Sequence, residues 1–186
     1  MSSTNYHYAA QITGTASSLV AAGAILSISA LINPVLDTSA RSVSAEKPSP
    51  TTTLPAIRFL FSRGSHIFPQ AATVAGACFG YLAYNNSGRS GLVKPLQALV
   101  GVSLSKGAGY TLAAALSTAI MPLTFVMLPL ANNSLREMAE LKEKGKASEI
   151  DRDELKLYLS RFGALNYLRG YAILAGGVMG LMTMLD

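Results

Sequence analysis

One long apolar stretch of the sequence reads GALNYLRGYAILAGGVMGLMTML, residues 163–185, and Arg169 is its one charged residue. As an α-helix, a stretch of this length is long enough to cross the roughly 30 Å of hydrocarbon in a lipid bilayer. Three further stretches of similar length, residues 11–33, 66–85 and 107–130, carry no charge at all. The sequence therefore predicts four transmembrane helices.

The overall composition agrees with this prediction. Of the 186 residues, 50% are hydrophobic and 13% are charged, whereas about 25% charged residues is usual for a soluble domain. A soluble four-helix bundle would also carry charges along its exposed helix faces, and these stretches do not. We therefore expect an all-α protein, a four-helix transmembrane bundle that forms a single membrane domain over residues 1–186.

The basic residues indicate how this bundle is oriented. Eleven of them lie in the 1–2 and 3–4 connections, three lie in the 2–3 connection, and neither tail carries one. The positive-inside rule then places both long connections in the cytosol and both termini in the lumen or outside the cell, as in an integral, multi-pass protein. The basic pI thus reflects orientation and does not indicate nucleic-acid binding. An alternative for the first stretch is a cleaved signal peptide, but residues 1–10 lack the expected basic residues.

The two cytosolic connections differ in character. Residues 37–55 are rich in Ser, Thr and Pro, which predicts a flexible loop. Residues 133–161 predict a helical hairpin, whose first helix ends at Gly145 and whose second helix starts at Ser148 with a capping-box-like Asp151. The apolar stripe of the second helix consists of Leu155, Tyr158, Leu159 and Phe162.

A charge within a span is expensive to keep in lipid, which makes Arg169 a candidate functional residue. Asn166 lies three positions earlier and projects from the same helix face. Ala172, Gly176 and Gly180 continue this side as small residues suited to close helix packing. Two interpretations stay open: Arg169 extends to the headgroups or a helix-end carbonyl, or it forms with Asn166 a donor pair for an anionic or carbonyl oxygen.

Further polar residues cluster at the cytosolic end of the third span. Pro122 and Pro129 remove backbone hydrogen bonds there. Thr124, Asn132 and Asn133 lie close to them in the sequence. A kinked helix with a polar cap would explain these residues. The functional alternative is that the asparagines complete the wall of a pocket with Asn166 and Arg169.

The remaining chemistry-bearing residues are few. His66 opens the second span and is a candidate general base, because imidazole exchanges protons near neutral pH, although a solvated histidine at a helix start would look the same. Tyr167 could donate a hydrogen bond, as could any interfacial tyrosine. One cysteine and two histidines make a disulfide framework or a metal site improbable. The sequence also contains none of the common catalytic motifs.

Three segments make the chain resemble the anthrone oxygenase family, small membrane proteins of polyketide biosynthesis. They are Leu60-Phe61-Ser62-Arg63-Gly64 with Pro69 and Tyr81–Tyr84; Pro122–Thr124 with Met127–Pro129 and Asn132–Leu135; and Phe162–Arg169.

The resemblance implies oxidation of an anthrone methylene to a quinone carbonyl by O₂ as co-substrate, with no cofactor and no metal. For this reaction we expect Arg169 and Asn166 to act as oxyanion donors and His66 to act as the base. We also expect Asn132, Asn133, Thr124 and Tyr167 to lie around a hydrophobic polycyclic substrate that enters from the bilayer. The rival is a non-enzymatic four-span scaffold or accessory protein; a transporter is disfavoured, because the spans carry no acidic residue. The oligomeric state stays open, with a homo-oligomer among the options.

Overall fold

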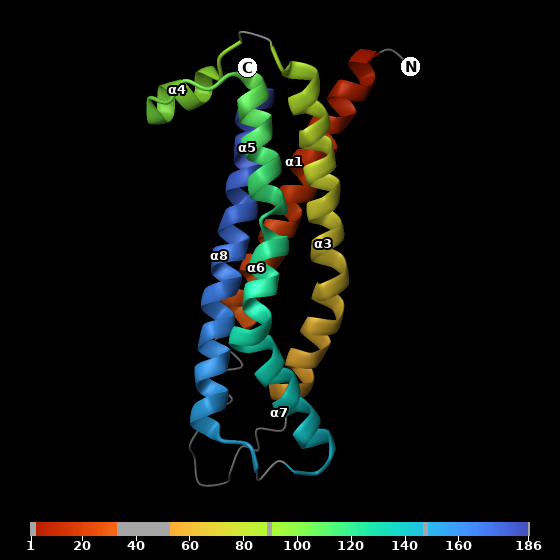
Figure 1. Ribbon diagram of the computed structural model, residues 1–186, viewed down its shortest axis with the longest axis vertical. Helices are drawn as coiled ribbons and strands as arrows, with labels where there is room; N and C mark the ends of the chain where they lie inside the picture. Colours follow the sequence, from red (N-terminus) through yellow and green to blue (C-terminus); the bar gives the residue numbers. More distant parts are fainter. Residues whose placement is uncertain (1–2, 33–52, 89–90, 147–148, 186) are drawn as a thin grey trace. The chain divides into compact units, whose positions relative to one another are not determined.

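The computed structural model describes residues 3–32, 53–88, 91–146 and 149–185, and this part of the chain is all-α (Figure 1). It contains no strand, although Leu92 and Ser105 form an isolated antiparallel bridge. The elements in chain order are α1 (Ser3–Ser27), η1 (Ile28–Ile32), α3 (Thr53–Asn86), α4 (Lys94–Val100), α5 (Lys106–Thr118), α6 (Ile120–Met127), η2 (Leu128–Asn132), α7 (Asn133–Glu143) and α8 (Arg152–Met184).

Proline residues explain where the third predicted span departs from one regular helix. Pro122 lacks an N–H and clashes with the carbonyl four residues before it, and α5 ends at that residue, Thr118. Pro129 lies in the π-helical turn η2 for the same reason. The predicted span 107–130 is therefore built from three helical pieces.

Two predicted boundaries need correction. Helix α3 begins at Thr53, so the last residues of the predicted loop 37–55 are helical; its residues 37–52 lie outside the described part. Helix α8 begins at Arg152, because the Asp151 carboxylate accepts from the backbone N–H groups of Asp153 at 2.8 Å and Glu154 at 3.4 Å. Asp151 is thus the N-cap itself, and Ser148, the predicted start, lies outside the described residues.

The end of α7 agrees with the prediction. Gly145 has a φ of 75°, a conformation that glycine adopts without strain. The N–H of Gly145 donates to the carbonyl of Lys142 at 2.9 Å, and the N–H of Lys146 donates to that of Leu141 at 2.9 Å. These two bonds form a Schellman motif, which stops the helix.

By their internal contacts the residues form two units, each described by itself. The first unit comprises residues 1–23, 68–121 and 169–186, and the second comprises residues 24–67 and 122–168. The chain passes from one unit to the other close to Pro69 in α3 and at Pro122 in α6.

In the first unit, α1, α5 and the adjoining parts of α3 and α8 pack side by side (Figure 1). Small residues permit this close packing, as predicted for the fourth span. A Cβ on Gly176 of α8 would lie 2.5 Å from the Ser117 hydroxyl of α5, and a Cβ on Gly180 would lie 2.4 Å from the ring of Phe79 in α3. The core of this unit contains Ala75, Phe79, Leu82, Tyr110 and Ala113.

The second unit has an apolar core of its own. It confirms the predicted stripe at the start of α8, where Leu155, Leu159 and Phe162 are buried and Tyr158 packs against them. Their partners come from α3, α6, η2, α7 and the turn before α8: Leu54, Met127, Ala131, Leu135, Met138, Ala139 and Ile150.

Two helical stretches of the described residues are long and apolar enough to cross a membrane, residues 4–30 and 106–143. They contain most of the first and all of the third predicted span. The other two predicted spans lie in α3 and α8, which are less apolar by the same measure. The four-span topology and its cytosolic hairpin therefore remain predictions.

Candidate functional site

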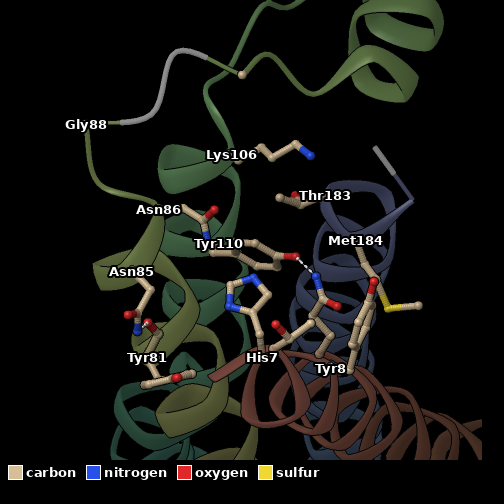
Figure 2. Close-up of a pocket in the computed structure, with 13 residues that line it drawn as sticks. His7, Tyr8, Tyr81, Asn85, Asn86, Gly88, Lys106, Tyr110, Thr183 and Met184 are labelled. Atoms are coloured by element: carbon tan, nitrogen blue, oxygen red, sulfur yellow. Dashed lines mark hydrogen bonds between the residues drawn. The ribbon is translucent and has the colours of Figure 1, made fainter. Parts of the chain in front are cut away.

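The first unit contains a cavity with a volume of 860 Å³, within the range of roughly 300–1,000 Å³ that is typical of small-molecule sites. Figure 2 shows labelled side chains from four helices pointing into the same hollow. Polar groups dominate its lining, which consists of Thr4, His7, Tyr8, Gln11, Tyr81, Asn85, Asn86, Gly88, Gly91, Lys106, Tyr110, Thr183 and Met184.

Helix α1 supplies the imidazole and an amide to this cavity. His7 and Gln11 are four residues apart, so their side chains leave the same face of the helix. His7 is half-buried, and its ring rises from α1 toward Tyr110 (Figure 2). Gln11 is 8% exposed. The first two turns of α1 thus bring a proton-accepting group to the edge of a buried amide.

The end of α3 and the start of α5 form the opposite wall. Ser105 caps α5, because its hydroxyl accepts from the N–H of Ala108 at 3.2 Å. Gly107 lets the two helices approach, since a Cβ there would lie 3.0 Å from the Asn86 carbonyl oxygen. Lys106, one residue before Gly107, also lines the cavity, and its side chain extends on the side of Thr183 (Figure 2).

Tyr110 is one of the most deeply buried polar groups of the cavity. Its side chain is 1% exposed, and its ring stacks on Phe79 with 6.4 Å between the centroids. The Tyr110 oxygen accepts a hydrogen bond of 2.8 Å from Nε2 of Gln11 (Figure 2). Because the phenol oxygen acts as the acceptor in this bond, its own proton can be donated to another group.

These residues define what the cavity can do chemically. An imidazole can accept a proton, and an ammonium and a phenol can donate to an oxygen on which negative charge develops. No group of three or more His, Cys, Asp or Glu side chains within the described ranges could hold a metal ion. This set of groups is therefore suited to acid–base chemistry on a bound small molecule.

The two residues on which the sequence-based site rested are both buried in α8. Asn166 is 1% exposed and belongs to the second unit, whereas Arg169 is 9% exposed and belongs to the first. Tyr167, between them in sequence, is 37% exposed. Burial of the amide and the guanidinium agrees with the expectation that this face points inward. Their role as oxyanion donors stays a prediction.

The other predicted site residues lie in the second unit. Thr124 in α6 and Asn132 in η2 are half-buried, and Asn133 in α7 is exposed. His66 is exposed on α3. None of these four residues lines the cavity of the first unit.

Sequence reasoning missed His7, Gln11 and Lys106 as members of one site. A signal was present, because His7, Gln11, Thr15 and Ser18 follow one another at helical spacing on a helix without charged residues. His7 lies outside the first predicted span, residues 11–33, so the prediction did not include it in this pattern. No local pattern in the sequence indicated that Lys106 and Tyr110 would meet residues located about a hundred positions earlier.

The described residues thus form apolar helices, and those of the first unit surround a cavity with a polar lining. The profile of the family described as "Anthrone oxygenase" matches residues 57–179, about two thirds of the chain. The chain therefore belongs to the anthrone oxygenase family. Of the cavity residues, His7 and Gln11 precede the matched region, whereas Lys106 and Tyr110 lie within it.

The chain is also similar to monooxygenase hypC of Dothistroma septosporum (strain NZE10 / CBS 128990). The two sequences are 29% identical over 124 residues, which are 67% of this chain and 58% of that relative. The match thus spans less than two thirds of the relative's length. No solved structure was found to match this chain.

Proposed function

We propose that this protein oxidises the methylene group of a polycyclic anthrone to a quinone carbonyl with O₂, in polyketide biosynthesis. Membership of the anthrone oxygenase family supports an oxygenase reaction, as does the name monooxygenase carried by the relative. The observation that carries the choice of site is the cavity of the first unit, which gathers His7, Lys106 and Tyr110 around one volume.

The reaction balances with O₂ alone. The methylene carbon loses two C–H bonds and gains a C=O bond, one oxygen atom enters the quinone, and the other leaves as water. The methylene supplies all four electrons. The proposed reaction therefore requires O₂ as co-substrate and no external reductant, and we propose that it needs no cofactor.

Deprotonation is the step that the protein can accelerate. Loss of a methylene proton converts the anthrone into a phenolate-like anion, whose charge lies largely on the carbonyl oxygen. In our proposal His7 accepts this proton. Lys106 and Tyr110 stabilise the oxyanion as pre-positioned donors, and the electron-rich anion then reacts with O₂.

The apolar helices suit the substrate as well as the reaction. A flat polycyclic molecule partitions into a bilayer, and a site within apolar helices can receive it from there. Residues 4–30 and 106–143, which are apolar enough to span a membrane, contribute His7, Gln11, Lys106 and Tyr110 to the cavity. We propose on this basis that the protein works as an integral membrane enzyme.

The oxyanion donors could also be Arg169 and Asn166, with the other residues predicted from the sequence around them. In this alternative the reaction is the same, but the active site lies at Arg169 and Asn166 instead of in the cavity. The cavity of the first unit is favoured because it combines a proton acceptor with two donors on one set of packed helices.

The test is to incubate membranes that contain the protein with an anthrone under ¹⁸O₂ and to follow the quinone by mass spectrometry. We expect quinone formation faster than in membranes without the protein, with one ¹⁸O atom in the product. Equal rates in both membranes across several anthrones would overturn the proposal and favour a non-enzymatic scaffold. Product oxygen derived from water would overturn the oxygenase step.

A further inference from the structure

Two buried side-chain oxygen atoms on α1 belong to Gln11, which lines the cavity, and to Thr15, which lies one helical turn further along. Gln11 and Thr15 are one helical turn apart on the same face, and each is 8% exposed. Gln11 Oε1 and Thr15 Oγ1 have no hydrogen-bond partner among the residues that the structure describes. Buried polar atoms of native proteins are nearly always hydrogen-bonded, so this pair calls for an explanation.

Thr15 differs in this respect from other helical threonines of the first unit. The hydroxyl groups of these threonines donate to the backbone carbonyl four residues earlier, at 2.8 or 2.9 Å: Thr73, Thr111, Thr118 and Thr183. The Thr15 hydroxyl makes no such bond within the described part of the chain. The Thr15 hydroxyl therefore has no hydrogen bond to the backbone of its own helix.

Ser18, the next polar residue along this face of α1, forms hydrogen bonds to neighbouring helices. Ser18 Oγ donates to the Ile173 carbonyl oxygen at 2.9 Å and lies 3.0 Å from Ser117 Oγ. On the outer side, the Nε2 atom of Gln11 is bonded to Tyr110. Along this face of α1, the two oxygen atoms without a hydrogen-bond partner thus lie between the Gln11–Tyr110 bond and the Ser18–Ser117 pair.

We propose that Gln11 and Thr15 hold a buried water molecule behind Tyr110. Water supplies what both atoms need, because it can donate to Gln11 Oε1 and either donate to or accept from the Thr15 hydroxyl. Buried waters typically serve groups of this kind.

The consequence rests on the proposed function. A side-chain amide can present either its NH₂ or its oxygen to Tyr110. A water that donates to Oε1 holds the oxygen away and keeps Nε2 facing the phenol, so that Tyr110 donates its proton into the cavity. With the amide reversed, Tyr110 would donate to Gln11 instead. Gln11 and Thr15 are therefore positioning residues for Tyr110.

The water site can be tested without any assay of activity. Thr15→Val keeps the shape and removes the hydroxyl, and Thr111→Val is the matched control, because the Thr111 hydroxyl already bonds to the Gly107 carbonyl. Removing an unsatisfied hydroxyl is neutral or stabilising, whereas removing one that holds a water needed by Gln11 is destabilising. We expect Thr15→Val to lower the Tm of the full-length protein in detergent by about 2–4 °C relative to Thr111→Val. An unchanged or raised Tm would overturn the water site.

The positioning role is tested by kinetics on unsubstituted anthrone, which has no hydroxyl group to take the place of the water. We expect Thr15→Val to lower kcat about tenfold with KM changed less than twofold, and Thr15→Ser to restore the wild-type kcat. Unchanged kcat, or a Thr15→Ser variant as slow as Thr15→Val, would overturn it. If the wild-type protein itself formed no quinone, the proposed function would be overturned instead. The Tm comparison would still show whether the water site exists.

Discussion

The Gln11 amide on α1 donates a 2.8 Å hydrogen bond to the Tyr110 hydroxyl on α5, between two residues 99 positions apart in the sequence. Both side chains are buried at the wall of a polar cavity. The direction of this bond matters more than its presence, because an amide that donates to the phenol leaves the phenol proton for the substrate. The structure thus contains an oriented donor at the site where we place the reaction.

Changing the direction of this bond should impair catalysis. Gln11→Glu replaces the donating NH₂ by a carboxyl oxygen, which accepts the Tyr110 proton. We expect kcat to fall about 10²-fold, the effect of losing one oxyanion donor. Tyr110→Phe should give a loss of similar size, and the double variant should be no worse than either single one. Additive losses in the double variant would show that the two residues act independently.

Packing of α8 against α5 should not tolerate a larger residue at Gly176. A Cβ there would lie 2.5 Å from Ser117 Oγ and 2.8 Å from the Ser117 backbone nitrogen. We expect Gly176→Ala to destabilise the protein by about 1–3 kcal/mol, because the backbone must shift. Gly80→Ala is the control, since no described atom lies within 4 Å of its Cβ, and it should be neutral or slightly stabilising. Denaturation of the two variants in detergent measures the difference.

Replacing Arg169 distinguishes the two proposed locations of the active site, the cavity of the first unit and the pair of Arg169 and Asn166. If the cavity of the first unit is the site, Arg169→Gln should alter thermal stability and leave kcat within about threefold of the wild-type value. If Arg169 is an oxyanion donor, kcat should fall by about 10²-fold or more. Steady-state quinone formation by the folded variant distinguishes the two results.

The orientation of the chain predicts which side of the membrane the cavity faces. Its lining comes from the N-terminal segment, the 2–3 connection and the ends of the predicted spans next to them, the side with three basic residues rather than eleven. In a Cys78→Ser background, an impermeant maleimide should label Tyr6→Cys from the lumenal or outer side and Glu137→Cys from the cytosolic side of sealed vesicles. Both positions are exposed. Labelling from the opposite sides would reverse the topology.

Much of the fold could be predicted, because it depends on local patterns. The all-α class, the small-residue face with Gly176 and the end of α7 at Gly145 follow from composition and helix chemistry. The start of α8 was placed too early, because Ser148 and Asp151 are both good N-caps and only the backbone contacts distinguish them.

The candidate site was harder to predict, because residues distant in the sequence build it. Arg169 and Asn166 are polar residues within one predicted span, where exposure to lipid costs free energy. Their burial could be predicted from that cost. The cavity instead depends on a close approach of Gly107 to the end of α3 and on a bond between α1 and α5. Neither contact can be predicted from a local sequence pattern.

The chain has two histidines, His7 in the cavity and His66 exposed on α3, and replacing each in turn tests whether the reaction takes place in this cavity. The measurement is the steady-state rate of quinone formation from an anthrone and O₂ by the His7→Gln and His66→Gln proteins in membranes. We predict that His7→Gln lowers kcat by about 10²–10⁴-fold, the usual contribution of a general base, and that His66→Gln stays within twofold of the wild type. A His7→Gln protein that retains full activity, or a comparable loss in His66→Gln alone, would contradict the placement of the reaction in this cavity.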